Sequence, residues 1–379
     1  MRRLFAAETG NYFLLLGTTL FLVACGLVMV LSSSSVTSYT ESDNFFRGFE
    51  RQATFAALGL PLMLIASRMP AVFWKKWAPL AIIVGLGLQF LTVATPLGYG
   101  VKGNTNWIMI GSINMQPSEV VKLALVIWLG STLARKQSEL HDWKKLAIAV
   151  GPVAGAAIGF VLLGRDMGTA LIITAIVMGA LFFAGVRLRY LAALVAALSV
   201  GAAIVAFASL SRQTRIQAWQ EGCTTDNDFL GSCWQTVHGW WALASGGIFG
   251  VGLGNSKAKW NWLPEADNDF IFAIIGEELG LLGAMLVLAL FLVMAIAFVR
   301  IIRSNPDPFA KITVSIVMVW VIVQAFVNIA VVLGVLPVLG VPLPLMSAGG
   351  TALISSMTAI GIALSFARRP NTAVNGGAR

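Results

Sequence analysis

The chain alternates between long apolar runs and short polar segments. About 20 apolar residues suffice for a helix to cross a hydrocarbon core of about 30 Å. Apolar runs near that length predict ten transmembrane helices, at residues 11–32, 53–67, 77–95, 118–134, 147–163, 168–186, 190–210, 270–299, 312–336 and 351–367. No polar linker divides these runs, so we expect a single transmembrane domain over residues 1–379. The predicted fold class is an all-α polytopic membrane protein.

The composition agrees with a membrane protein and excludes most other classes. Charged residues make up 11% of the chain and hydrophobic residues 58%, whereas a soluble domain carries roughly 25% charged residues. The net charge of +9 could suggest a nucleic-acid-binding protein. However, the basic residues form small clusters between apolar runs instead of one basic face, so nucleic acid is not an expected partner.

The distribution of Lys and Arg predicts the orientation of the chain. With a cytoplasmic N-terminus, 17 of the 26 basic residues fall in cytoplasmic segments, and every inner loop is basic. This is the pattern of the positive-inside rule. Both termini are therefore expected in the cytoplasm. Most acidic residues fall outside or within spans, which an outward-facing active site would explain.

The longest predicted loop, residues 211–269, lies outside the membrane between the seventh and eighth helices. A loop of this length in a tight bundle is usually functional. Cys223 and Cys233 lie within it, and in an oxidising outer compartment a disulfide is the natural interpretation. Two free thiols are the alternative. Cys25, within the first span, is expected to be a packing residue.

The end of this loop carries three carboxylates within five residues: Glu265, Asp267 and Asp269. They meet the outer end of a membrane helix, and Glu277 and Glu278 follow two turns further in. Carboxylates at such depth usually mark a function or a buried pair. Asn268 or Asp269 could instead cap the helix and interact with its dipole. Spacing alone leaves capping and catalysis equally open.

A second group of polar residues begins the fourth span with Gln116-Pro117-Ser118-Glu119, and Lys122 follows. Glu119 and Lys122 share a helix face at i, i+3. A Lys about one turn inside a span needs a partner or a wet cavity. A structural ion pair is the first interpretation, and an anionic ligand facing Lys122 is the second.

Other polar residues carry weaker signals. Asp166 is expected to cap the sixth helix. Basic residues bracket the long loop and could bind phosphate or be ordinary solvated charges: Arg212, Arg215, Lys257 and Lys259. Residues 250–254, GVGLG, lack the strand–turn–helix frame of a nucleotide loop. The two histidines, His141 and His238, are distant and suggest neither a metal cluster nor a Ser–His pair.

Several blocks of the chain together resemble the SEDS family (shape, elongation, division and sporulation), its FtsW branch more than its RodA branch. The similarity covers nearly the whole chain. Departures occur at Asn106, Arg165 and the pair Asp267-Asn268, where the family often has Arg, Pro and His-Thr. The matching blocks are residues 29–36 (MVLSSSSV), Gln116-Pro117-Ser118-Glu119 with Lys122, residues 263–266 with Asp269-Phe270, residues 276–280 (GEELG) and residues 340–350 (GVPLPLMSAGG).

The resemblance implies a peptidoglycan glycosyltransferase that polymerises lipid II with a class b penicillin-binding protein during cell division. It identifies Asp269 with the essential outer-loop aspartate of the family. It also suggests substrate-binding roles for Glu119, Lys122, Arg215, Gln235 and Lys259. No cofactor is implied with certainty, although a divalent cation such as Mg²⁺ or Mn²⁺ could assist. The metal site, if there is one, is not identified by the sequence.

Two other functions fit a membrane protein of this family. A lipid II flippase should show internal repeats and interrupted helices that meet near the membrane midplane, and the sequence shows no convincing repeat. A scaffold that only recruits the penicillin-binding protein would leave the carboxylate cluster without a purpose. The sequence therefore favours an enzyme acting at the outer face of the cytoplasmic membrane. The resemblance to FtsW implies that the enzyme acts at the division septum.

Overall fold

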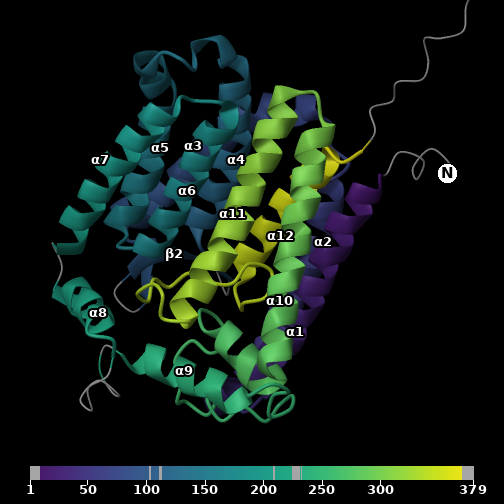
Figure 1. Cartoon of the computed structure of the whole chain (residues 1–379), viewed down its shortest axis with the longest axis vertical. Coiled ribbons are helices and arrows are strands. Elements are labelled where there is room, and N and C mark those ends of the chain that lie inside the picture. Colours follow the sequence, from purple (N-terminus) through teal and green to yellow (C-terminus); the bar gives the residue numbers. More distant parts are fainter. Residues whose placement is uncertain are drawn as a thin grey trace, which may run out of the picture.

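A long helix lies at each of the ten predicted spans. The structure, a computed structural model, describes residues 9–101, 104–110, 113–207, 210–223, 231 and 233–368. Figure 1 shows the helices as one bundle. Their bounds are α1 (Gly10–Ser42), α2 (Arg47–Ala66), α3 (Ala71–Ala94), α4 (Pro117–Arg135), α5 (Trp143–Leu163), α6 (Met167–Ala184), α7 (Leu188–Phe207), α10 (Ile271–Ser304), α11 (Pro308–Val332) and α12 (Gly350–Ser365).

Within the described residues, seven of these helices are long and apolar enough to cross a membrane: α1, α3, α4, α5, α6, α10 and α11. Shorter apolar helices cover Leu188–Gly201 and Gly350–Ser365. The remaining bundle helix, α2, has Arg47, Glu50 and Arg51 in its first two turns. The predicted polytopic helical fold is thus the fold observed.

The first helix continues ten residues beyond its predicted end at residue 32. Its second half is rich in Ser and Thr, which usually weaken helices by competing for backbone hydrogen bonds. Here the hydroxyls donate to carbonyls four residues back, as Ser34 does to Val30 (2.7 Å) and Ser42 to Ser38 (2.7 Å). The helix then ends at Asp43, which has a left-handed backbone conformation (φ 56°).

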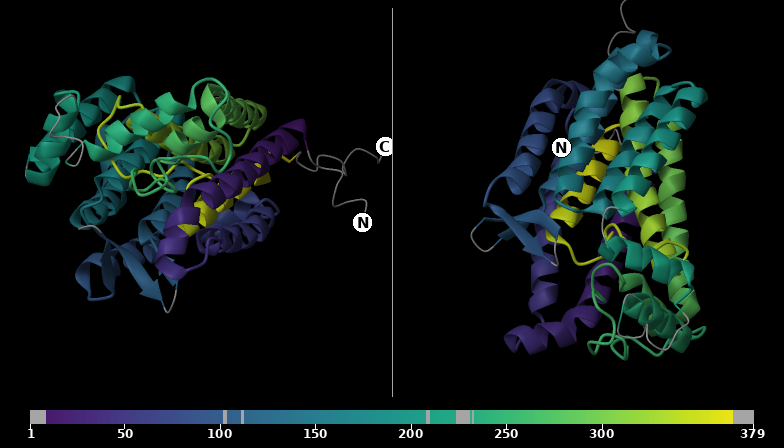
Figure 2. Two further views of the ribbon diagram at one scale, coloured as in Figure 1. Left: turned by 90° about the horizontal axis from the view of Figure 1, so that it is seen from below. Right: turned by 90° about the vertical axis from the view of Figure 1, so that its left-hand side faces the viewer.

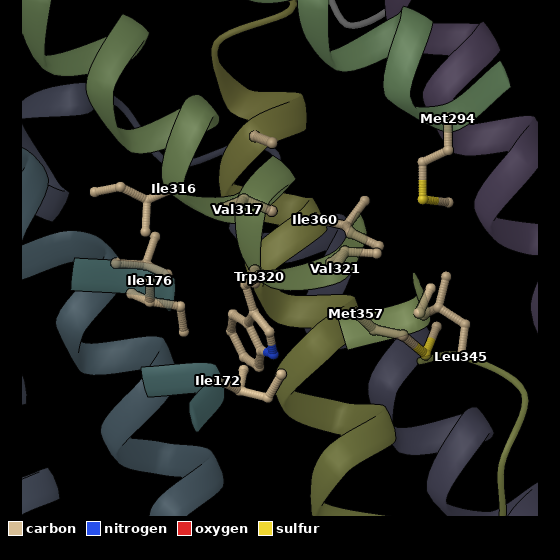
Figure 3. Close-up of a cluster of buried hydrophobic side chains, with 14 of the residues drawn as sticks. Ile172, Ile176, Met294, Ile316, Val317, Trp320, Val321, Leu345, Met357 and Ile360 are labelled. Carbon is tan, nitrogen blue, oxygen red and sulfur yellow. The ribbon is translucent and has the colours of Figure 1, made fainter. Parts of the chain in front are cut away.

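The centre of the bundle is α11, which packs against α4, α6, α10 and α12. A helix that is apolar on all sides is expected in such a position. Its Ile316, Val317 and Trp320 are fully buried. Figure 3 shows them among side chains of α6 and α12, including Ile172 and Ile360.

A small antiparallel sheet, absent from the sequence prediction, follows α3. It consists of β1 (Gly98–Val101), β2 (Asn104–Ile110) and β3 (Ile113–Met115), in the order β1-β2-β3. In register, Gly98 pairs with Ile108, and Ile108 pairs in turn with Met115. The sheet contacts α3 and α4 and projects from one side of the bundle (Figure 2, right). Local hydropathy did not predict it because these strands are short and carry no clear alternation.

The long outer loop also contains structure of its own. It forms α8 (Leu210–Gln220) and α9 (Trp234–Gly246), which lie across one end of the bundle (Figure 1). Cys223 and Cys233 are joined by a disulfide between these helices, with their Cα atoms 5.6 Å apart. Cys25 is a half-buried free thiol that packs against the core, as expected. The α9 helix packs against α10 and α11, so the loop covers the outer ends of both helices.

Candidate active site

The carboxylate segment, residues 263–270, is a tight turn that leads into α10. The turn is closed by backbone hydrogen bonds from Asn268 and Phe270 to the carbonyl of Glu265 (3.1 and 3.0 Å). The residue before α10 is Phe270, and no side chain caps the helix. The capping interpretation of Asn268 and Asp269 is therefore wrong. The turn places Phe270, and neither Asn268 nor Asp269, at the cap position of the helix.

The backbone of Asp269 is held by a buried amide of α11. Asn328 is 1% exposed, and its Nδ2 donates to the carbonyls of Asp269 and Val341, both at 2.7 Å. Its Nδ2 atom bridges two segments that are distant in sequence. On the other side, a Cβ added to Gly340 would lie 3.6 Å from Oδ2 of Asp269. Gly340 has φ +70°, which favours glycine. The Asp269 carboxyl group thus lies against a glycine turn.

A second clamp holds the residues just before Asp269. The Ser347 hydroxyl donates to the carbonyl of Asn268 (2.7 Å) and accepts from the amide of Leu343 (2.8 Å). The amide of Ala348 donates to the carbonyl of Asp267 (2.8 Å). Leu343, Ser347 and Ala348 all belong to the 340–350 block, so this block supports the carboxylate turn.

One acid of the turn, Asp267, has a shifted pKa. Burial raises the pKa of Asp267, and the neighbouring Glu265 carboxylate raises it further. Asp267 is therefore closer to its neutral form than an ordinary aspartate. Asp269 is half-buried at the same turn. The turn thus holds Asp267, whose pKa is raised, and Asp269, whose carboxyl group lies beside Gly340.

Glu119 and Lys122 form a buried ion pair. Their side chains are 3% and 2% exposed, and Nζ of Lys122 lies 2.7 Å from Oε1 of Glu119. The same ammonium donates to Oε1 of Gln324 (3.1 Å) and lies over the Trp320 ring, 4.9 Å from its centroid. Nε2 of Gln324 donates to the carbonyl of Pro342 (3.0 Å). This network joins α4 and α11 to the 340–350 block.

Asp166 caps α6, as the sequence predicted. Its Oδ1 accepts from the Thr169 amide and its Oδ2 from the Thr169 hydroxyl, both at 2.8 Å. Nε2 of Gln116 also donates to Oδ2 of Asp166 (3.3 Å), and the Gln116 amide donates to the hydroxyl of Thr351 (3.3 Å). Gln116 therefore links the beginnings of α4, α6 and α12 on the same side of the bundle.

Lys259 is buried against α10 and α1. Its Nζ lies 3.4 Å from Oε1 of Glu278 and donates to the carbonyl of Gly254 (2.6 Å). The Ser32 hydroxyl donates to the same Glu278 oxygen (2.6 Å). Glu278 is thus one half of a buried pair, one of the two roles that its depth suggested. A substrate-binding role for Lys259 stays a prediction, since its observed contacts are structural.

The neighbouring Glu277 fixes the loop that precedes the carboxylate turn. Its carboxylate accepts hydrogen bonds from the Ser256 hydroxyl and from the amides of Lys257 (2.9 Å) and Ala258 (3.4 Å). A buried carboxylate requires such donors, because an unpaired charge at this depth is costly. The two glutamates of α10 therefore anchor the outer loop.

The remaining predicted site residues lie on the two helices of the outer loop. Arg215 belongs to α8, but its side chain lies outside the described part of the structure. Gln235 is half-buried near the start of α9. His238 is buried on the same helix, and Nδ1 shares a hydrogen bond of 2.9 Å with the Trp234 carbonyl. Roles for Arg215 and Gln235 in substrate binding stay predictions.

In the part of the chain that the structure describes, no three His, Cys, Asp or Glu side chains are grouped so that they could hold a metal ion. A divalent cation is therefore kept as a prediction, without assigned protein ligands.

Sequence reasoning missed the residues that hold the site together: Asn328, Ser347 and Gln52. Nε2 of Gln52 donates to the Ser347 carbonyl (2.9 Å), and its Oε1 accepts from the Gly349 amide (3.1 Å). A signal for Asn328 was available. Gln324 and Asn328 are polar residues at i, i+4 in an otherwise apolar span, and such residues usually face the bundle interior with a partner.

Comparison with known proteins identifies the family. A family model for cell cycle proteins, covering FtsW, RodA and SpoVE, matches residues 12–372. The probable peptidoglycan glycosyltransferase FtsW of Mycobacterium bovis is 37% identical, over 96% of this chain and 69% of its own length. The corresponding FtsW of Coxiella burnetii is also 37% identical, over 92% and 94%. Stage V sporulation protein E of Bacillus subtilis is 32% identical, over 95% and 98%.

Solved structures share the fold. A chain from a peptidoglycan synthase complex that coordinates polymerization and crosslinking has a TM-score of 0.77 and 24% identity, covering 96% of this chain and 98% of its own. The rod shape determining protein RodA of Thermus thermophilus has a TM-score of 0.69 and 22% identity, covering 96% and 97%. Since the family model spans almost the whole sequence, this chain belongs to the FtsW/RodA/SpoVE family of cell cycle proteins, the SEDS family that its sequence blocks resemble.

Proposed function

We propose that this chain is a peptidoglycan glycosyltransferase that polymerises lipid II into β-1,4 glycan strands at the outer face of the cytoplasmic membrane. The observation that carries the proposal is the position of Asp269. Its carboxyl group does not cap α10, while its backbone is held by Asn328 and its Oδ2 lies against Gly340. A general base must lie within hydrogen-bond reach of the proton that it takes, and a fixed backbone helps to hold the carboxylate in such a position.

In the proposed reaction, Asp269 takes the proton from the 4-hydroxyl of the acceptor GlcNAc. The resulting oxygen forms a bond to the anomeric carbon of the donor MurNAc. The bond from that carbon to the lipid pyrophosphate breaks, with inversion. One carboxylate suffices because pyrophosphate leaves as an anion and needs charge neutralisation more than a proton. Glycoside hydrolases, which expel a poorer leaving group, usually use two carboxylates.

The pyrophosphate charge must be neutralised by a cationic group. Lys122 and Lys259 are buried in ion pairs with Glu119 and Glu278, so we propose that their main effect on the reaction is to hold the frame of the site. Lys257 is exposed on the same outer loop and can reach a phosphate. A divalent cation carried by the substrate is the other source of charge.

The flippase alternative requires helices interrupted near the membrane midplane. Among the described residues, α10 is interrupted at Gly280, but this position is only ten residues from the outer start of the helix. The interruption therefore belongs to the outer face, where polymerisation would occur. We propose further that a class b penicillin-binding protein is the partner and that the complex acts at the division septum, as the resemblance of the sequence to FtsW implies.

Polymerisation of purified lipid II, with and without the partner and in the presence of an inhibitor of penicillin-binding-protein glycosyltransferases, tests the proposal. Asp269→Asn should lower the rate by about 10²- to 10⁴-fold, because an amide cannot accept the proton. Asp267→Asn is the matched control. Since burial raises the pKa of Asp267, a neutral amide at this position should change the activity far less than the same replacement at Asp269.

Expression, thermal stability and association with the partner should survive both changes, since Asn adds no cavity and no charge. Wild-type polymerisation by Asp269→Asn would exclude the general-base role. If the wild-type chain instead failed to polymerise lipid II and flipped it in vesicles, transport would be the better assignment.

A further inference from the structure

The interruption of α10 is caused by a turn of the outer loop. Gly280 has φ +69° and ψ −167°, outside the helical region. A Cβ at this position would lie 2.4 Å from both the Gly250 amide nitrogen and the Ile248 carbonyl oxygen. Only a glycine lets the two backbones come this close. Residues 246–253, which we call the outer wedge, are therefore packed directly into the break in α10.

Hydrogen bonds between the outer wedge and α10 replace those that the break removes. Two wedge amides donate to α10 carbonyls, and two α10 amides donate to wedge carbonyls. The four bonds are Val251 to Glu277 (3.0 Å), Gly252 to Glu278 (3.0 Å), Leu281 to Gly247 (2.9 Å) and Leu282 to Ile248 (3.2 Å). Irregular backbone is tolerated near hydrocarbon only where its polar groups are satisfied within the protein. The outer wedge meets that condition at these positions.

The side chains of the outer wedge point away from the protein and are apolar. Phe249 is 80% exposed and Ile248 is 59% exposed; Val251 and Leu253 are also exposed. Adjacent to them in the hydrogen-bonded pairing, α10 presents Leu281 and Leu282, which are exposed as well. These side chains continue the lipid-facing stripe of α10, which includes the exposed Met285 and Leu292.

The depth of the outer wedge follows from the length of α10. Leu281 precedes Arg300, at the cytoplasmic end, by 19 residues. At 1.5 Å per residue this is about 29 Å, close to the thickness of a hydrocarbon core. Ile248 pairs with Leu282. The outer wedge thus lies at the outer boundary between hydrocarbon and headgroups.

We propose that the outer wedge inserts Ile248 and Phe249 into the outer leaflet of the lipid bilayer and fixes the depth of the outer loop. The favoured occupant of this surface is lipid because it is continuous with the lipid-facing side of a transmembrane helix and carries no charged residue. The inner side of the same loop holds Lys259 and Ser256 against the α10 glutamates. The outer loop therefore contacts lipid through the outer wedge and contacts the α10 glutamates through Ser256 and Lys259. This inference does not depend on the reaction that the chain catalyses.

Site-directed spin labelling of the chain alone in lipid nanodiscs tests the proposal. Phe249→Cys is labelled with a nitroxide in a Cys25→Ala background, because Cys223 and Cys233 are bonded to each other. Collision with O₂, which concentrates in lipid, is compared with collision with a water-soluble nickel chelate. Leu292→Cys on α10 is the lipid control, and Lys257→Cys on the exposed side of the loop is the water control.

The label at residue 249 should show the O₂-dominated accessibility of the label at residue 292. Ile248→Cys should give the same result, so that one perturbing label cannot decide the outcome. Nickel-dominated accessibility, as at residue 257, would place the outer wedge in water and overturn the proposal. Low accessibility to both reagents would show that protein covers the surface, from a second copy or another part of the chain, and would equally overturn it.

Discussion

Replacing Asn328 with Leu removes the amide that holds the Asp269 backbone while keeping the branched shape and the number of heavy atoms of the side chain. The change leaves the carbonyls of Asp269 and Val341 without their 2.7 Å donor. An unsatisfied buried polar group costs about 1–3 kcal/mol, so the variant should be destabilised by roughly that amount for each carbonyl. If the Asp269 carboxylate also moves by about 1 Å, the rate can fall about 10²-fold.

The assay is the initial rate of lipid II polymerisation, measured as kcat and KM below the melting temperature of every variant. Asn328 acts through Asp269, so kcat should fall while KM for lipid II changes little. The matched control is Asn305→Leu at the cytoplasmic side. Nδ2 of Asn305 likewise donates to two carbonyls, those of Ile301 (2.8 Å) and Phe366 (2.9 Å).

Asn305→Leu should keep a wild-type kcat, because its carbonyls are remote from the site. A merely structural role for Asn328 predicts a lower melting temperature with an unchanged kcat for the folded protein. That outcome, or an equal loss of kcat in both variants, would refute positioning of Asp269 by Asn328.

Two further predictions concern stability, measured as thermal unfolding in detergent. Gly280→Ala should destabilise the chain by about 1–3 kcal/mol, because its backbone conformation (φ 69°, ψ −167°) is nearly restricted to glycine. The close approach of Ile248 should add to this loss. Gly87→Ala, with open space around it, should not destabilise the chain, and equal melting temperatures of the two variants would contradict the wedge packing. Lys122→Met should lower the free energy of unfolding by about 3–5 kcal/mol, because it leaves Glu119 buried without its partner. Adding Glu119→Gln to the same chain should restore much of this stability. Additive losses in the double variant would mean that the pair is not coupled.

The membrane spans and the helix caps could be predicted from the sequence because both depend on residues that are close together in the chain. Each of the ten apolar runs became a helix, since hydropathy over about 20 residues is enough to specify a membrane span. The Asp166 cap was predicted for the same reason, because its acceptor and the Thr169 donors are three residues apart. The pairing of Glu119 with Lys122, one turn along α4, was likewise the first interpretation of their spacing.

The arrangement around Asp269 was decided by tertiary contacts. Local spacing allowed Asp269 to cap α10 or to act in catalysis, and the choice depended on how the chain entered the helix. That entry is held by Asn328, 59 residues further along, and by Ser347, 79 residues beyond Asn268. No local pattern encodes such distances.

The break in α10 was likewise not predictable from local sequence. Residues 276–280 continue an apolar helical run into the span, and a single glycine in such a run does not predict an interruption. The break forms because the outer wedge supplies hydrogen bonds to the carbonyls of Glu277 and Glu278.

The sequence by itself determined which segments cross the membrane and which acids reach its outer face. Only the tertiary structure decided which of those acids are bound in ion pairs or by hydrogen bonds, because burial and hydrogen bonding depend on segments brought together by folding.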